Sequence, residues 1–303
     1  MQITQPLIIV GTGRCGSTVF HRILARYPRF MWLSGFAERY PDKPSWNRLA
    51  VSAMGNPLLF RLLGDKVRPG EAYRFWEQYA YGFTEPCRDL VRADLTPRTR
   101  KRTRRAIEAT LTPQRDRFLA KITGWPRIGF LDALFDDAKF VHIVRDGRAV
   151  ANSLLHVDFW RGWYGPQGWR AGLLTPEDEA AWLRYDRSFV ALAGIEWRIQ
   201  MRAIEAARRA LDPRKYLEIR YEEFCQRPLD TYRQVLDFAE LPSTPAFEQE
   251  IGRTSLHDTS GRWRDELSPE QQGILDELLR PDLERCGYVG SRDVHPQAVA
   301  AGR

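Results

Sequence analysis

The stretch most able to do chemistry is a glycine-containing turn between an apolar run and an amphipathic helix. The apolar run covers residues 7–10, the turn covers residues 11–16, and the helical pattern continues to residue 27. Apolar residues without alternation are typical of a parallel strand that is covered on both faces. Glycines let the backbone approach a ligand, and free amides at a helix start attract negative charge. The turn is therefore predicted to bind a phosphate-like anion.

This turn is close to the G-x-x-x-x-G-K-[ST] loop of enzymes that bind nucleotide triphosphates, with one difference. Gly11, Gly16 and Thr18 fit that spacing, but Ser17 occupies the lysine position. A cation, Arg14, lies inside the loop instead. These residues favour a phosphate loop that does not serve ATP hydrolysis. The structural alternative is a turn that only joins a strand to a helix.

A second apolar run, residues 140–144, ends in a cation. Arg145 stands where an ATPase would carry a magnesium-binding aspartate after its hydrophobic run. Ser153 follows eight residues later, two turns into the next expected helix. The guanidinium and the hydroxyl could therefore face one bound anion.

Together the two stretches resemble the cofactor motifs of the sulfotransferases that use 3'-phosphoadenosine-5'-phosphosulfate (PAPS). Residues 145–153 resemble the R-x7-S element of that family, which holds the 3'-phosphate through the residues equivalent to Arg145 and Ser153. The loop resembles the family's 5'-phosphosulfate loop, [KR]-x-G-[ST]-[ST], and the residues that carry this likeness are Gly13, Arg14, Cys15, Gly16, Ser17 and Thr18. The resemblance implies PAPS as sulfuryl donor, adenosine 3',5'-bisphosphate (PAP) as product, and no metal.

Two later motifs extend the resemblance. Tyr221 begins a Y-E-E-F segment similar to the family's Y-E-[DE]-[LFM], whose tyrosine lies against the adenosine; a buried structural tyrosine is the alternative. The late G-x-W-[KR] signature near the nucleotide is represented here by Arg262, Trp263 and Arg264. The R-K-G triplet of cytosolic members is missing. Arg253, Arg262 and Arg264 are the candidates to replace its contact with the 3'-phosphate.

Two further residues of the site follow from the expected strand 118–122. Lys121 falls near the end of this strand, and the resemblance implies that it is the second basic residue at the phosphosulfate. A strand-end lysine that reaches solvent is the alternative. Thr123 stands where cytosolic members carry a catalytic histidine, so the resemblance does not supply a histidine base.

The base is therefore sought among the carboxylates. In many similar enzymes a glutamate shortly after the first helix accepts the proton of the acceptor hydroxyl, and Glu38 occupies that place here. A solvated surface glutamate is the alternative reading of Glu38, since a base is judged by geometry. His156 and Asp158 are reserve candidates.

The charges predict a mechanism. In-line displacement at sulfur builds negative charge on the bridging oxygen of the leaving PAP, and a positioned cation stabilises that charge most in the transition state. Arg14 is the first candidate for this role and Lys121 is the second. The role of Arg14 is electrostatic, because arginine does not lose its proton in proteins.

Length and composition favour one α/β domain. The chain has 303 residues, of which 43% are hydrophobic, and this is ample for a sizeable core. We expect a three-layer α/β/α domain over residues 1–303, with a mostly parallel sheet and the P-loop-like sulfotransferase fold. Residues 33–115 and 156–175 are expected to be insertions on the acceptor side, and residues 290–303 a flexible tail.

The net charge of +7 suits anionic ligands but does not by itself identify them. The basic run at residues 98–105 predicts a solvated face, with contact to anionic lipid or polysaccharide as the alternative. If they are exposed, the aromatics of residues 156–170 favour a carbohydrate or glycolipid acceptor over a small phenol or alcohol. Burial as anchors of the loop is the alternative use of these rings. A hydroxyl acceptor is preferred to an amine, and no nucleic acid partner is expected. The rival functions are a nucleotide kinase, which needs a magnesium site, and a non-catalytic polyanion-binding protein.

The sequence also carries a prediction about location. No apolar run approaches the length of a membrane span, and the opening residues 1–6 lack a signal pattern. We therefore expect a soluble, cytoplasmic protein. The large excess of arginine over lysine indicates a genome rich in G and C, and hence a bacterial source.

Overall fold

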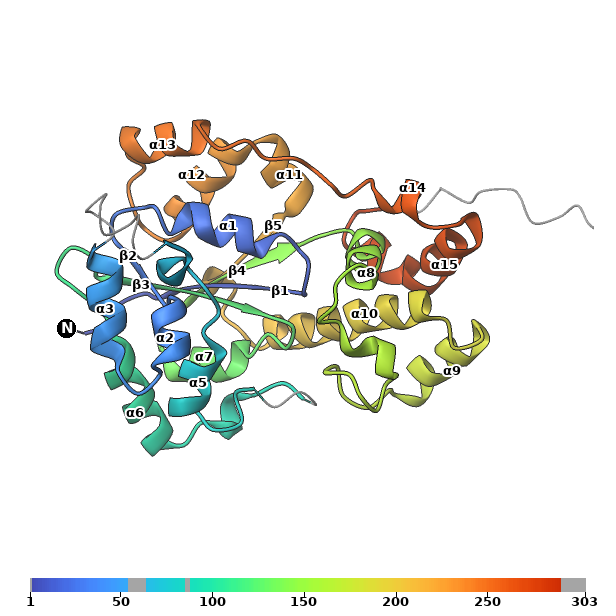
Figure 1. The fold of residues 1–303 in the computed structure, drawn as a ribbon, viewed down its shortest axis with the longest axis horizontal. Coiled ribbons are helices and arrows are strands. Elements are labelled where there is room, and N and C mark those ends of the chain that lie inside the picture. The colour runs from blue at the N-terminus through green and yellow to red at the C-terminus, as the bar shows by residue number, and fades with distance from the viewer. Residues whose placement is uncertain (1, 54–63, 85–87, 290–303) are drawn as a thin grey trace, which may run out of the picture.

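A parallel sheet of five strands organises the fold (Figure 1). The computed structural model describes residues 2–53, 64–84 and 88–289. The strands are β1 (Leu7–Gly11), β2 (Phe30–Trp32), β3 (Arg117–Thr123), β4 (Lys139–Val144) and β5 (Tyr216–Arg220), and their order across the sheet is β2-β3-β1-β4-β5. All neighbouring pairs of these strands are parallel, in agreement with the expected mostly parallel sheet.

The register of the central strands positions the site. Gly11, at the end of β1, is level with Thr123 of β3 and Ile143 of β4. The carboxyl ends of these three strands therefore meet at one edge of the sheet. In the sheet, β2 and β3 lie on one side of β1, and β4 and β5 lie on the other. The strand order therefore reverses direction at β1, and ligands of such sheets bind beside this switch point.

The strands β1, β3 and β4 coincide with the strands predicted at residues 7–10, 118–122 and 140–144, but β2 was not predicted. Residues 30–32 were too short to show a period of their own, and they become a strand by pairing with β3. Phe30 is level with Arg117, and Trp32 is level with Leu119. This pairing makes β2 the edge of the sheet from which residues 33–115 depart.

Helices cover both faces of the sheet, which gives the three expected layers (Figure 1). One face carries α1 (Ser17–Leu24), α11 (Tyr221–Gln226), α12 (Pro228–Phe238) and α13 (Pro245–Gly252). The other carries α7 (Ile128–Leu134) and α10 (Phe189–Arg209). Beyond the carboxyl end of β4 lie α8 (Gly147–Leu155), α9 (Pro176–Arg184), α14 (Trp263–Glu266) and α15 (Pro269–Arg285).

The segments expected to be insertions form short helices. Between β2 and β3 lie α2 (Gly35–Arg39), α3 (Pro44–Ser52), η2 (Gly64–Val67), α5 (Tyr73–Tyr79), η3 (Arg92–Asp94) and α6 (Pro97–Glu108). Between α8 and α9 lies η4 (Arg161–Tyr164), and η5 (Pro213–Lys215) precedes β5. The expected tail at residues 290–303 falls outside the described residues.

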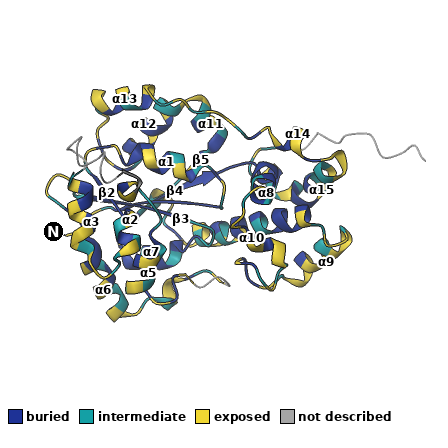
Figure 2. Ribbon diagram, viewed as in Figure 1, coloured by how far each residue is buried: buried dark blue, intermediate teal, exposed yellow. Residues whose placement is uncertain are grey.

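The core runs through the sheet and anchors the helix that follows the predicted phosphate loop (Figure 2). All side chains of β1 are buried. On α1, the ring of Phe20 lies 5.1 Å from that of Phe224 on α11 and 5.0 Å from that of Tyr232 on α12. This aromatic cluster fixes α1, and with it the direction in which the amides at the start of α1 point.

We expect Phe20→Ala to lower the free energy of unfolding by about 3–5 kcal/mol, because it removes a fully buried ring from this cluster. Val19→Ala is the matched control, since Val19 is only partly buried on the same helix. Urea denaturation followed by fluorescence measures both. Equal losses in the two variants would contradict the anchoring role of Phe20.

Candidate functional site

The predicted phosphate loop has the backbone of an anion site. Arg14 and Gly16 both lie in the left-handed region, with φ values of 64° and 88°. A Cβ on Gly16 would lie 2.2 Å from the ring of Tyr221, so only glycine fits beneath this tyrosine. Cys15 is fully buried, and burial raises the pKa of its thiol above the ordinary value. The Cys15 side chain therefore fills space beneath the loop.

Helix α10 supports the loop from below. The N–H of Gly13 donates to Gln200 Oε1 over 3.2 Å, and Gln200 Nε2 donates to Glu196 Oε1 over 3.1 Å. Trp160 Nε1 donates to Glu196 Oε2 over 2.7 Å. Burial raises the pKa of the Glu196 carboxyl. The sequence motifs gave no signal for Glu196 or Gln200, because their relation to the loop arises only from the packing of α10.

Four residues predicted to contact the donor lie in one cluster. Arg14 Nε donates to Ser153 Oγ over 2.9 Å, and Arg145 Nη1 donates to the carbonyl oxygen of Arg14 over 2.9 Å. Among the residues that the structure describes, Arg14 thus links Ser153 to Arg145. The guanidinium of Arg145 also lies 4.4 Å from the ring centre of Tyr221. The cluster places two guanidinium groups and a hydroxyl beside the loop, where they could hold an anion.

Residues just before the late signature complete the surroundings of Arg145. Arg145 Nη2 donates to Thr259 Oγ1 over 2.9 Å, and its Nε donates to Ser260 Oγ over 3.3 Å. Ser260 Oγ in turn donates to Glu222 Oε1 over 2.9 Å. Thr259 and Ser260 were not predicted as site residues. Their only signal in the sequence is that they adjoin the late signature.

The signature residues themselves face α8 and solvent. Trp263 is buried, with the guanidinium carbons of Arg148 and Arg264 at 4.5 and 4.6 Å from its ring centre. Arg262 is exposed. Arg253, the other candidate for the missing triplet, is exposed and lies 3.4 Å from the Glu250 carboxylate. Within the described residues, then, Thr259 and Ser260 bring this segment to Arg145, and the signature lies beyond them.

Lys121 joins the loop to a neighbouring cavity. Its Nζ donates to Thr18 Oγ1 over 2.9 Å and lies 2.9 Å from Glu71 Oε1, while its side chain is only 8% exposed. Thr123 Oγ1 donates to the same Glu71 oxygen over 2.6 Å. Lys121 is therefore held inside the site and does not extend to solvent. Glu71 was missed by sequence reasoning, because no motif surrounds it.

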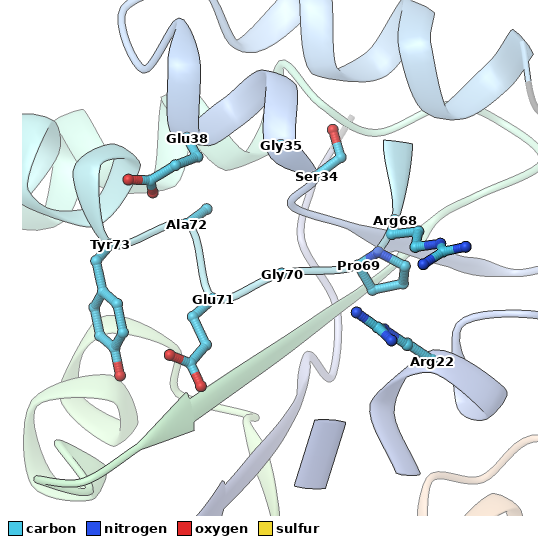
Figure 3. Close-up of a pocket in the computed structure, with 10 residues that line it drawn as sticks. All are labelled: Arg22, Ser34, Gly35, Glu38, Arg68, Pro69, Gly70, Glu71, Ala72 and Tyr73. Carbon is cyan, nitrogen blue, oxygen red and sulfur yellow. The ribbon is translucent and has the colours of Figure 1, made fainter. Parts of the chain in front are cut away.

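The cavity beside Lys121 has a volume of about 370 Å³. It is lined by Arg22, Ser34, Gly35, Glu38, Arg68, Pro69, Gly70, Glu71, Ala72 and Tyr73. Figure 3 shows Glu38, Glu71 and Tyr73 toward one end of the cavity, and the guanidinium groups of Arg22 and Arg68 toward the other. Tyr73 OH donates to the carbonyl of Thr123 over 2.8 Å, and burial raises the pKa of this phenol. The cavity thus adjoins the phosphate loop and has two ends of opposite charge.

The three candidates for the base occupy different places. Glu38 lines the cavity, and its Oε2 accepts a hydrogen bond from the backbone N–H of Arg74 over 3.1 Å. His156 and Asp158 are exposed and do not line it. His156 Nδ1 lies 2.8 Å from the carbonyl oxygen of Asn152. Of the three, only Glu38 lines the cavity that Glu71, the ion-pair partner of Lys121, also lines.

Residues 6–245 match the profile of the sulfotransferase family. The chain belongs to this family. A curated relative in Mycobacterium tuberculosis, the omega-hydroxy-beta-dihydromenaquinone-9 sulfotransferase Stf3, is 25% identical over 54% of this chain and 38% of its own length. Human carbohydrate sulfotransferase 3 is 26% identical over 55% of this chain and 38% of its own length. The chain therefore spans less than half the length of these relatives.

Solved sulfotransferases share the fold. The crystal structure of STF9 from Mycobacterium avium superposes with a TM-score of 0.59 at 17% identity, covering 94% of this chain and 77% of that one. STF1 from Mycobacterium tuberculosis superposes with a TM-score of 0.54 at 15% identity, covering 92% and 77%. The expected P-loop-like α/β sulfotransferase fold is confirmed.

Neither a cluster of potential metal ligands nor an apolar helix of membrane-spanning length occurs in the part of the chain that the structure describes. In residues 2–53, 64–84 and 88–289 no cluster of three or more His, Cys, Asp or Glu side chains is arranged to hold a metal ion. None of the helices in this part of the chain combines the length and the apolar character that crossing a membrane requires.

We expect Gly16→Ala to destabilise the protein by about 1–3 kcal/mol, because the new Cβ would strain the left-handed backbone and strike Tyr221. Gly13→Ala is the matched control in the same loop, since a Cβ there meets nothing within 4 Å. Thermal unfolding without ligand measures both variants. A Gly13→Ala variant as unstable as Gly16→Ala would show that a methyl group added at either glycine destabilises the loop, and would remove the specific role of Tyr221.

Proposed function

We propose that this protein transfers the sulfuryl group of PAPS to a hydroxyl acceptor, and less readily to an amine, without a metal. The observation that carries the proposal is Lys121, which touches the phosphate loop at Thr18 and the cavity at Glu71. One cation thus adjoins both the predicted donor site and a cavity of a size suited to a small-molecule group. Membership of the sulfotransferase family supports the same reaction.

For the donor, we propose that the loop amides at residues 13–18 and Arg14 hold the 5'-phosphosulfate, while Arg145 and Ser153 hold the 3'-phosphate. Tyr221 packs between Gly16 and Arg145, which suits a residue that borders the adenosine. Arg262, Trp263 and Arg264 follow Thr259 and Ser260, the two contacts of Arg145. In this arrangement Arg14 neutralises the 5'-phosphosulfate and Arg145 neutralises the 3'-phosphate.

For the reaction, we propose that Glu38 accepts the proton of the acceptor hydroxyl while its oxygen bonds to sulfur. The bond between sulfur and the bridging oxygen of the donor breaks, and PAP leaves with the electron pair. Arg14 and Lys121 stabilise the negative charge on that oxygen. Glu71 positions Lys121. Glu38 suits the role of base better than Glu71. A proton taken up by Glu71 would break its ion pair with Lys121, whereas Glu38 forms no ion pair in the described structure.

For the acceptor, we propose a carbohydrate or a glycolipid, with a small phenol or alcohol as the alternative. Exposed aromatic side chains in residues 156–175 support this choice, because sugar faces and apolar chains both pack on such rings. Phe159 is 70% exposed and lies 5.9 Å from the guanidinium of Arg14, and Tyr164 is 78% exposed. Trp160 and Trp169 are buried and anchor the segment. Residues 33–115 and 156–175 would thus form the acceptor side of one domain.

A cytoplasmic location and peripheral contact with an anionic membrane stay predictions. On α6, several of the basic side chains are already engaged within the protein. Arg100 pairs with Asp136, and Arg104 donates to the carbonyl of Leu134. The exposed cations of this helix are Arg98, Lys101, Arg102 and Arg105. Membership of the sulfotransferase family, and not the contacts of α6, favours the enzyme over the non-catalytic polyanion-binding rival.

We expect PAP to raise the melting temperature far more than AMP or ATP at equal concentration, because only PAP carries the 3'-phosphate assigned to Arg145 and Ser153. A ligand present at 100 times its dissociation constant adds about 2.7 kcal/mol to the free energy of unfolding. Differential scanning fluorimetry measures the three shifts in melting temperature, once with EDTA and once with magnesium. Equal shifts would contradict the 3'-phosphate site, and an ATP shift that needs magnesium would favour the kinase rival.

We expect Glu38→Gln to slow transfer to an aliphatic alcohol by about 100-fold or more, and to an acidic phenol much less, because only the alcohol needs a base. Glu71→Gln should slow transfer to both acceptors alike, since it releases Lys121. Steady-state rates with both acceptors, with PAP affinity as a control for Glu38→Gln, separate the two roles. An acceptor-dependent loss in Glu71→Gln instead would make Glu71 the base. If neither variant loses rate selectively with the alcohol, His156 and Asp158 become the candidates for the base.

A further inference from the structure

The cavity beside Lys121 has a cationic end that the proposed reaction does not use. Arg22 and Arg68 line it opposite Glu38 and Glu71 (Figure 3). We propose that this end binds an anionic group of the acceptor, such as a carboxylate, sulfate or phosphate. The acceptor would then carry its own negative charge in addition to the hydroxyl that is sulfated. This inference rests on the proposed function and names the class of acceptor for that site.

The position of Arg22 assigns it to the acceptor and not to the donor. Arg22 lies four residues after Thr18 on α1, so the two side chains share one face of the helix. One turn of helix separates them, a rise of about 6 Å. Thr18 is the residue that contacts Lys121 at the loop. Arg22 therefore lies beyond the loop, on the cavity side of Lys121.

Arg68 reaches the same cavity from another part of the chain. Pro69, which follows it, forms an isolated antiparallel bridge with Ser34, and the N–H of Gly70 donates to the carbonyl of Leu33 over 2.9 Å. These contacts hold residues 68–71 against Leu33 and Ser34, which follow β2. Residues 68–71 therefore carry a cation, Arg68, and a carboxylate, Glu71, toward the two ends of the cavity.

The carboxylates of the cavity do not neutralise Arg22. Glu71 pairs with Lys121, and Glu38 accepts a backbone N–H from Arg74. In the ranges that the structure describes, no carboxylate forms an ion pair with Arg22, and this side chain is exposed. A guanidinium that faces a cavity without a carboxylate partner is suited to bind the oxygens of an anionic ligand, in a bidentate geometry where the ligand allows it.

This charge distribution also selects one orientation of the acceptor. An anionic group is attracted to Arg22 and Arg68 and repelled by Glu38 and Glu71. Anchoring the anion at the cationic end directs the rest of the molecule toward Glu38 and Lys121, where the hydroxyl would react. Fixing the reacting group in this way raises the rate by reducing the orientations that must be searched. Arg22 would thus determine both which acceptor binds and which hydroxyl is sulfated.

The test compares matched anionic and neutral probes by calorimetry on protein saturated with PAP. The pairs are methyl β-D-glucuronide with methyl β-D-glucoside, and 4-hydroxybenzoate with phenol. In at least one pair we expect the anionic probe to bind about tenfold tighter, as a charge-assisted hydrogen bond predicts. Arg22→Gln should remove this preference, and Arg22→Lys should retain part of it. Melting temperatures check that the variants are folded.

Arg26→Gln is the matched control. It removes the same charge from the chain just after α1, but Arg26 pairs with Glu250 and does not line the cavity. Its preference should equal that of the wild type. Any of three results would overturn the anionic subsite. The wild type could show no preference in either pair, the preference could survive Arg22→Gln, or Arg26→Gln could lose it equally.

Two further titrations separate this inference from the proposed function: PAP into the free protein, and the anionic and neutral probes into protein without PAP. A protein that binds PAP but shows no preference for anionic probes loses only the subsite. A protein that does not bind PAP but prefers the anionic probe through Arg22 loses the donor assignment and keeps the subsite. Failure of both measurements would contradict both proposals.

Discussion

The nearly buried ammonium of Lys121 is the interaction on which the rest of the site depends. A lysine that is 8% exposed needs partners, because removing its charge from water without them is costly. Its partners come from two separate segments, Thr18 at the start of α1 and Glu71 in the segment that follows β2. Satisfying this one charge therefore ties the phosphate loop to the cavity wall. A donor and an acceptor bound on its two sides would meet at Lys121.

Arg145 has the corresponding role on the other side of the loop. Its guanidinium donates to the carbonyl of Arg14 and to the hydroxyls of Thr259 and Ser260, so it joins β4, the loop and the segment before α14. Every partner is an uncharged oxygen, and the positive charge of Arg145 is therefore not neutralised by these contacts. The loop thus lies between two cations, Arg145 held by uncharged oxygens and Lys121 held by a hydroxyl and the Glu71 carboxylate. Positive charge on both sides of the loop suits an anionic donor.

Much of the fold and part of the site could be predicted from the sequence. The apolar runs of β1 and β4 predicted buried parallel strands, since strands covered on both faces lack polar alternation. The loop from Gly13 to Thr18, and Arg145 at a strand end, were recognisable because each is a local pattern. The strand β2 was missed, because three residues show no period and pair only when β3 is present.

Local patterns were readable from the amino-acid sequence: the phosphate loop, the cations at the strand ends and the alternation of strands and helices. The tertiary structure decided which distant residues meet them. Glu71 reaches Lys121, and Arg22 and Arg68 share one cavity, although they belong to segments separated by β2 and the short helices after it. No local pattern encodes such contacts, because packing and parallel strand register bring these segments together only after the chain has folded.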